Sequence, residues 1–488
     1  MNHFLNPSLS TVIHRPAIRA MALAVAALCV AAQSQAQSTV YQYEYDNVGN
    51  VTKITNANNV ATLQNYDVHN RLQTQTDGNN KVTGYDYDGQ HRLIKVTDAR
   101  SLSTLYSIDG LGNQLSQTSP DTGTTTTVVD VAGNILTRTD AKNQTTSYVY
   151  DVLNRITRIT YHDGSVINYS YDQGVNAKGR LTQITDANST ILYSYDSRGR
   201  VLTDTRSINA VSYVTSYQYD TAGRVSSLTY PNGRQVSYTR DGLGRISQID
   251  TTKDGITMTV LSQAVYRPFG GVQSYHNSAG QTYSRTFDGD ERITSYTLNN
   301  KVQAITYDAV NRITSINEVN NPSRQISHGF DNLDRLTSYT TPQTSQTFTY
   351  DAVGNRSTKT TGAANTNYTY ASTSNRLTQV ADSQSKAIST DANGSITSNG
   401  NTQFTYDARG RMTTATTSTG VVQYTINALG QRIQKAVPAN GSNAAISTLY
   451  HYDSGGKLIS ERSVQSGQSA QSDVDYIYLG DIPVAVIK

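Results

Sequence analysis

Disulfides, tryptophan and strong charge are largely missing from this sequence. Its 488 residues include no Trp and a single Cys, and charged residues make up only 16% of the chain. One Cys cannot form an internal disulfide, so burial and hydrogen bonds must stabilise the fold. The 40 basic residues nearly cancel the 37 acidic ones without forming a basic patch. Nucleic-acid binding is therefore not predicted.

Motifs for catalysis and for ligand binding are also missing. The sequence contains no Gly-x-Ser-x-Gly nucleophile elbow and no phosphate-binding P-loop. Its histidines are not paired at metal-ligand spacing. Residues 86–89 and 288–291 resemble parts of calcium loops but lack the full pattern and its distant Glu. No catalytic, cofactor or metal residue is predicted, and calcium binding stays an open alternative.

The first 36 residues have the pattern of a secretory signal peptide. Arg15 and Arg19 precede an apolar run at 20–32, and small residues lead up to Ala36. Cleavage after Ala36 predicts a bacterial protein that is secreted or held at the cell surface. A membrane anchor is the alternative, but thirteen apolar residues are too few to span a bilayer. The remaining 452 residues have a net charge of +1, no Cys and no predicted membrane span.

An Asp recurs at a fixed spacing along the chain. Its first seven positions, each 21 residues after the last, are Asp46, Asp67, Asp88, Asp109, Asp130, Asp151 and Asp172. Asp196, Asp220 and Asp241 continue the series at similar spacing. A period near 20 residues indicates a repeat architecture, in which one small unit stacks on the next.

The unit can be interpreted position by position in residues 148–159. Tyr148 and Tyr150 alternate, which favours a strand with both rings on one face. Asp151 then starts a turn, because its carboxylate can accept backbone N–H groups. Three residues later comes Asn154, or Gly in many copies, which tolerates positive φ. Arg155 follows, and the next strand begins; the intervening turn residues argue against a helical Asp–Arg pair.

These turns supply the residues that the sequence singles out as structural positions. They are Tyr45, Asp46, Gly49, Tyr87, Asp88, Arg92, Tyr150, Asp151, Arg155, Tyr195, Asp196, Gly199, Arg200, Tyr219, Asp220, Gly223, Arg224, Tyr307, Asp308, Arg312, Tyr350, Asp351, Gly354, Tyr406, Asp407, Gly410 and Arg411.

The apolar residues after the Arg do not fit a flat strand. Ile156 and Ile159, for example, are three apart, so a flat strand would place them on opposite faces. Either a β-bulge re-aims one of them or both faces of the strand are covered. Both explanations stay open at this stage.

A second kind of turn lies between the Asp turns. Residues 161–164 and 230–233 contain Asp-Gly and Asn-Gly between β-favouring runs, a strong hairpin signal. A full unit is therefore two strands with a turn at each end. Residues 272–293 repeat the pattern of 225–246 without a gap, and a looser array follows.

The 34 Tyr residues are the abundant feature of the chain. Tyr buries a large ring and keeps a hydroxyl for a partner, which suits a sheet face that is covered but not dry. The structural interpretation is packing within the repeats. The functional alternative is a glycan-binding surface, because sugars stack on aromatic rings.

The Tyr-Asp-x-x-Gly-Arg unit resembles the YD-repeat, or RHS-repeat, family over residues 40–488. The closing phrase at 478–487, Tyr-Leu-Gly-Asp-Ile-Pro-Val-Ala-Val-Ile, resembles one found near the end of such repeats. The resemblance implies a long β-strip that spirals into a hollow shell. Bacterial members enclose a toxic C-terminal domain, and teneurins carry a similar shell. This chain stops seven residues after Asp481 and has no Asp-Pro, so autoproteolysis and toxicity are not expected of it.

The sequence thus predicts an all-β fold of tandem antiparallel hairpins in a curved sheet that spirals into a hollow, barrel-like shell. The expected division is a signal peptide at 1–36 and repeat arrays at 37–260 and 261–488. The expected function is a secreted, non-enzymatic shell or scaffold of a toxin-related or cell-surface system. Its expected partner is an enclosed polypeptide cargo or a missing C-terminal core. A carbohydrate-binding or cell-surface adhesin is the alternative, and a hydrolase has no named site.

Overall fold

The computed structural model describes residues 40–441, 443–467 and 471–488. The predicted signal peptide lies outside these residues. Apart from one short 3-10 turn, η1 (Pro322–Arg324), the regular elements of the described part are β-strands. The all-β prediction is confirmed.

Strands β1 to β22 make up the first part of the strip. They are β1 (Gln42–Tyr45), β2 (Val51–Thr55), β3 (Ala61–Tyr66), β4 (Leu72–Thr76), β5 (Val82–Tyr87), β6 (Leu93–Thr97), β7 (Ser103–Ile108), β8 (Gln114–Ser119), β9 (Gly123–Val129), β10 (Ile135–Thr139), β11 (Thr145–Tyr150), β12 (Ile156–Thr160), β13 (Val166–Tyr171), β14 (Leu181–Thr185), β15 (Ser189–Tyr195), β16 (Val201–Ile208), β17 (Val211–Tyr219), β18 (Val225–Thr229), β19 (Gln235–Arg240), β20 (Ile246–Lys253), β21 (Ile256–Tyr266) and β22 (Val272–Asn277).

Strands β23 to β43 continue it. They are β23 (Thr282–Phe287), β24 (Ile293–Leu298), β25 (Lys301–Tyr307), β26 (Ile313–Glu318), β27 (Gln325–Phe330), β28 (Leu336–Thr340), β29 (Ser345–Tyr350), β30 (Arg356–Thr361), β31 (Ala364–Tyr370), β32 (Leu377–Ala381), β33 (Ser385–Ala387), β34 (Ser389–Thr390), β35 (Ile396–Ser398), β36 (Gln403–Tyr406), β37 (Met412–Thr417), β38 (Gly420–Ile426), β39 (Arg432–Val437), β40 (Ile446–Tyr452), β41 (Leu458–Gln465), β42 (Gln471–Leu479) and β43 (Ile482–Ile487).

Each strand pairs antiparallel with its neighbour in the sequence. The pairing runs without interruption from β1 to β33, and a second sheet runs from β34 to β43. Pairing continues through β20, β21 and β22, across the predicted division at residue 260. That division stays a prediction from the sequence.

A β-bulge explains the apolar residues that are three apart. In the hairpin of β11 and β12, Tyr148 pairs with Ile159 and Tyr150 pairs with Ile156, and the register shifts between Val149 and Tyr150. Two residues of β12 therefore face one residue of β11, which turns both isoleucines to the tyrosine face. The same shift recurs in the hairpins of β1 with β2, β13 with β14 and β17 with β18.

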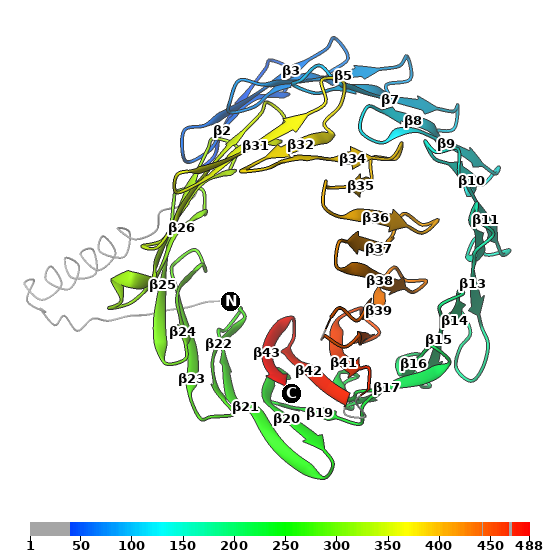
Figure 1. Cartoon of the computed structure of the whole chain (residues 1–488). Helices are drawn as coiled ribbons and strands as arrows, with labels where there is room; N and C mark the ends of the chain where they lie inside the picture. The colour runs from blue at the N-terminus through cyan, green and yellow to red at the C-terminus, as the bar shows by residue number, and fades with distance from the viewer. Residues whose placement is uncertain (1–39, 442, 468–470) are drawn as a thin grey trace, which may run out of the picture.

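The strip winds into a spiral that Figure 1 shows as a ring (Figure 1). The yellow strands around β31 return to the blue strands of β2 to β5, after which the chain continues inside the ring (Figure 1). Polar contacts join turns one circuit apart: 250 residues separate Asn58 from Asp308, and 253 separate Asp140 from Asn393. We call β1 to β22 the first lap and β23 to β43 the second lap.

The two laps meet along one edge each. We call the turns at the repeat Asp the YD turns, the turns at the opposite ends of the strands the far turns, and the line of contact the seam. Along the seam, far turns of the first lap contact YD turns of the second. The YD turns of the first lap therefore form a free rim.

The main apolar core lies where the end of the chain packs inside the ring. Ile459, Ile477 and Leu479 of β41 and β42 are buried against residues of β17 to β22, including Leu228 and Ile249. Figure 1 shows β42 and β43 within the ring, beside β19 and β20 (Figure 1). Leu228 pairs with Tyr217, so the tyrosine face of the first lap is the inner face.

Candidate functional site: the repeat cassette, the seam and the inner face

The repeat Asp organises the YD turn through its carboxylate. Asp151 Oδ1 accepts the backbone N–H groups of Leu153 at 2.9 Å and Arg155 at 3.0 Å. Its Oδ2 accepts Nε of Arg155 at 2.7 Å. Asn154, three residues after the Asp, has a φ of 59°, in the left-handed region where Asn and Gly are favoured.

Within the described residues, the Asp–Arg pair recurs in nine cassettes with Nε donating to Oδ2. The pairs are Asp67–Arg71, Asp88–Arg92, Asp151–Arg155, Asp196–Arg200, Asp220–Arg224, Asp241–Arg245, Asp288–Arg292, Asp308–Arg312 and Asp331–Arg335. The hydrogen bond from Arg71 lowers the pKa of Asp67 to about 2. These carboxylates are thus occupied as turn acceptors, a structural use.

The Arg also ties its cassette to the next one. The Arg155 guanidinium lies 4.2 Å from the ring centroid of Tyr171 and donates to Asp172 Oδ2 at 2.7 Å. The Tyr171 hydroxyl donates back to the carbonyl of Ile156 at 3.0 Å. Ring, guanidinium and carbonyl therefore link consecutive hairpins, beyond the ladder hydrogen bonds.

The predicted structural positions occupy equivalent places along the strip. Tyr45, Tyr87, Tyr150, Tyr195, Tyr219, Tyr307, Tyr350 and Tyr406 end strands, and each is followed by its turn Asp. Gly49, Gly199, Gly223, Gly354 and Gly410 all have positive φ. Arg411 is the exception among the predicted arginines, because Asp407 Oδ2 accepts Nε of Arg409 instead, at 2.9 Å.

Arg100 shows how the seam is built. From the far turn between β6 and β7, its guanidinium donates to the carbonyls of Ala371 at 2.7 Å and Ser374 at 3.0 Å, both in a YD turn of the second lap. From that same turn, Nδ2 of Asn375 donates to Asp98 Oδ2 at 3.1 Å. The laps are thus joined by hydrogen bonds between turns.

Where the second lap curls inside the first, charged groups are buried between the layers. Arg234 donates to Asp475 Oδ2 at 2.5 Å, and Asp475 is only 1% exposed. Arg206 pairs with the fully buried Asp204 at 2.8 Å. Burial, with the nearby Arg462, lowers the pKa of His451 to about 4, so this imidazole is neutral near pH 7.

The seam residues were missed by the repeat reasoning. Arg100, Arg234 and Asp475 lie outside the cassette positions, and their partners are more than 200 residues away. Arg138, which forms no bond across the seam, does carry a local signal, because it stands where other repeats have an apolar residue such as Ile159. In the described ranges, no group of three His, Cys, Asp or Glu is placed to hold a metal ion.

The geometry defines a class of protein: a wall of stacked hairpins with an aromatic inner face. Two family models match the chain. The RHS-repeat model matches residues 66–103, 129–166, 175–207, 205–235 and 219–257, and the teneurin YD-shell model matches residues 263–452. The chain belongs to the YD/RHS-repeat proteins, as its repeat motif predicted. No curated protein matches its sequence.

Solved structures of toxin complexes share the fold. The Tc holotoxin pore of Photorhabdus luminescens matches with a TM-score of 0.75 and 16% identity, over 91% of this chain and 27% of that one. TcdB2-TccC3 without its hypervariable C-terminal region matches with a TM-score of 0.77 and 16% identity, over 92% and 28%. Intact TcdB2-TccC3 has a TM-score of 0.76 at 16% identity, over 91% and 28%. This chain thus spans little more than a quarter of those chains.

Proposed function

We propose that the chain is a secreted, non-enzymatic shell that encloses a polypeptide. One observation carries the proposal: the inner face of the first lap binds a layer of polypeptide inside the ring. That layer is the chain's own β40 to β43, with Ile477 and Leu479 buried on it. Away from this layer the inner face stays half-buried, as at Tyr148 and Ile156. An apolar, aromatic face of this kind suits an enclosed chain.

The tyrosine rows favour this shell over a glycan-binding surface. The Tyr171 and Tyr350 hydroxyls are bonded to backbone carbonyls, and a guanidinium covers one face of each ring. Sugar stacking requires an uncovered ring face, and the guanidinium already occupies one face of each of these rings. None of the described residues forms a helix long and apolar enough to cross a membrane.

The toxin relatives agree with a shell that encloses cargo, since one solved TcdB2-TccC3 structure is named as lacking a hypervariable C-terminal region. Figure 1 places the C-terminal end of this chain within the ring (Figure 1). A segment joined after Lys488 would therefore begin inside the wall.

A protease-sensitive tag tests this proposal. We would append a flexible tag after Lys488 and, in a control chain, insert the same tag at Gln343, an exposed far turn of the second lap. The tag after Lys488 should be cleaved at least about 10-fold more slowly, because the wall excludes the protease. Equal cleavage rates in the two chains would refute an enclosed interior.

Export is tested separately from enclosure. The signal peptide predicted at 1–36 implies that the exported protein begins at Gln37. Amino-terminal sequencing of protein recovered outside a bacterial host should find that residue. An intact Met1 on the recovered protein, or its retention inside the cell, would contradict the secreted location.

A further inference from the structure

A polar cavity of about 620 Å³ lies between the laps, where the inner face of β8 to β12 meets YD turns of the second lap. Thr125 of β9 lines it, and the tyrosine positions of β9 hold smaller residues. Thr127 and Val129 occupy the places that Tyr148 and Tyr150 hold in β11. The tyrosine pattern of the repeat is therefore interrupted at the strand next to the cavity.

Arg138 lines this cavity from the first lap. It pairs with Thr127 in the ladder, as Ile159 pairs with Tyr148 one repeat later, so its side chain lies on the inner face. A cation thus replaces an apolar residue of the repeat. No carboxylate or carbonyl of the described chain accepts a hydrogen bond from its guanidinium.

Arg411 lines the opposite side, and it too departs from the repeat. Asp407, the carboxylate that would normally pair with Arg411, binds Arg409 instead, at 2.9 Å. Arg409 also forms an ion pair across the seam with Asp186 at 3.1 Å. The Arg411 backbone N–H still bonds to Asp407, but within the described residues its guanidinium has no ion-pair partner. Nine other cassettes keep that pair, so the repeat itself is the internal reference.

The acidic groups of the cavity do not neutralise these two arginines. Asp140 accepts Nδ2 of Asn393 at 2.6 Å, and Asp391 is 3.3 Å from Nζ of Lys142. Asp407 is bound by Arg409. All three carboxylates are therefore engaged, and four cations line the cavity against three anions.

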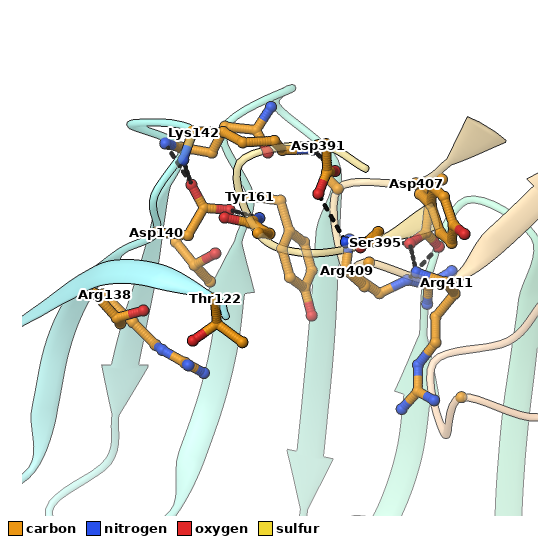
Figure 2. Close-up of a pocket in the computed structure, with 18 of the residues that line it drawn as sticks. Thr122, Arg138, Asp140, Lys142, Tyr161, Asp391, Ser395, Asp407, Arg409 and Arg411 are labelled. Carbon is orange, nitrogen blue, oxygen red and sulfur yellow. Dashed lines mark hydrogen bonds and ion pairs between the residues drawn. The ribbon is translucent and has the colours of Figure 1, made fainter. Parts of the chain in front are cut away.

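Figure 2 shows Tyr161 between Arg138 and Arg411 (Figure 2). Its hydroxyl points downward in that view, toward the level of the two guanidinium groups. Burial raises the pKa of Tyr161 to about 12, so the hydroxyl keeps its proton and can donate. Two guanidinium groups and a phenol are hydrogen-bond donors suited to carboxylate or phosphate oxygens.

We propose that this cavity is an oxyanion-binding site, in which Arg138, Arg411 and Tyr161 bind a phosphate group or a carboxylate. The ligand is either a free anion or an acidic side chain of an enclosed polypeptide. Both guanidinium groups face the same cavity from different laps. Occupancy would therefore also bridge the seam, and ligand binding should raise the stability of the chain.

Isothermal titration calorimetry tests the site on the full chain at low ionic strength, with inorganic phosphate and a tetraglutamate peptide as separate probes. We expect one site per chain for at least one of the probes. Arg138→Gln and Arg411→Gln should each weaken binding at least about 10-fold, the effect of one charge-assisted hydrogen bond.

The matched control is Arg158→Gln. Arg158 is an exposed arginine of β12 on the outer face, so its replacement removes the same charge away from the cavity. Unchanged affinity in this variant supports the site. If only phosphate binds, the ligand of the cavity is a free anion. If the peptide binds, the ligand is an acidic side chain of a polypeptide. Absence of binding by both probes, or equal weakening in Arg158→Gln, would overturn the proposal.

Discussion

The YD turns are exposed to solvent in the first lap and partly covered in the second. On the free rim of the first lap, the apolar tips of the YD turns lie in solvent: Val131 is 100% exposed and Val152 is 99% exposed. In the second lap, Val353 lies two residues after its Asp, as Leu153, which is 66% exposed, does on the rim. Val353 is half-buried, because far turns of the first lap lie against it. One local sequence therefore builds both edges, and winding decides which edge is covered.

The comparison separates local contacts, which fold each hairpin, from long-range contacts, which join the laps. The cassette is local: Asp, a residue with positive φ, Arg and the next Tyr fold each hairpin with partners in its own or the adjoining unit. The seam is long-range, and its residues, such as Arg100 and Asn375, are 275 positions apart. A change in the cassette should thus act alike in both laps, whereas a change at the seam should act in only one.

The largest effect is expected from breaking a buried ion pair between the laps. Arg234→Met leaves Asp475 buried without its cation, which should reduce the free energy of unfolding by about 3–5 kcal/mol. Arg224→Met on the free rim breaks a pair that is open to solvent and should cost at most about 1 kcal/mol. Urea denaturation of both variants measures the difference; equal losses would contradict a seam that stabilises the spiral.

The next effect depends on pH. Because the pKa of His451 is about 4 when folded and near 6.5 when unfolded, the unfolded chain binds more protons between those values. Its contribution is complete above pH 6.5 and is lost as the pH falls to 4, by roughly 3 kcal/mol. His451→Phe should remove this part of the pH dependence in thermal unfolding. A variant with the same slope as the parent chain would show that His451 is not buried between the layers.

A smaller difference is expected at the turn tips. Val353→Asp places a charge against Ala99 and Leu333 at the seam and should cost about 1–2 kcal/mol. Val152→Asp, on the bare rim, should change stability by no more than about 0.5 kcal/mol. Melting temperatures of the two variants make the test. A greater loss at Val152 would mean that the rim is covered.

The smallest effect tests the cassette itself. Gly410 has a φ of +74° and open space around it, so Gly410→Ala should cost about 1 kcal/mol through backbone strain alone. Gly89 lies directly after its Asp without positive φ, and Gly89→Ala should be neutral or slightly stabilising. Equal effects at the two positions would argue against the left-handed residue as the origin of the turn.

Much of the fold could be predicted because each hairpin is specified locally. The Tyr148–Tyr150 alternation gave the strand, Asp151 the turn and Asn154 the positive φ. The bulge stayed one of two alternatives, since three-residue spacing of Ile156 and Ile159 fits either a re-aimed side chain or a strand covered on both faces. Only the observed register decides between them.

The seam could not be predicted, because lap contacts depend on the curvature summed over many hairpins. A small change in twist per strand would place Asp140 opposite a residue other than Asn393. The cavity was hidden for a similar reason. Arg138 breaks the repeat visibly, whereas Arg411 stands at the regular cassette position, and only the winding of the strip shows that they face one space.

The hollow interior is tested most directly by thiol labelling with reagents of two sizes. The only natural Cys is Cys29, so a chain expressed from Gln37 onward carries only the thiol that is introduced. The two test variants are Val486→Cys, on the inward side of β43, and Val152→Cys, on the rim. The native side chain is 55% exposed at Val486 and 99% exposed at Val152. Iodoacetamide should label both. A maleimide carried on a folded protein should label Val152→Cys and spare Val486→Cys, whereas equal labelling by the large reagent would contradict an enclosed interior.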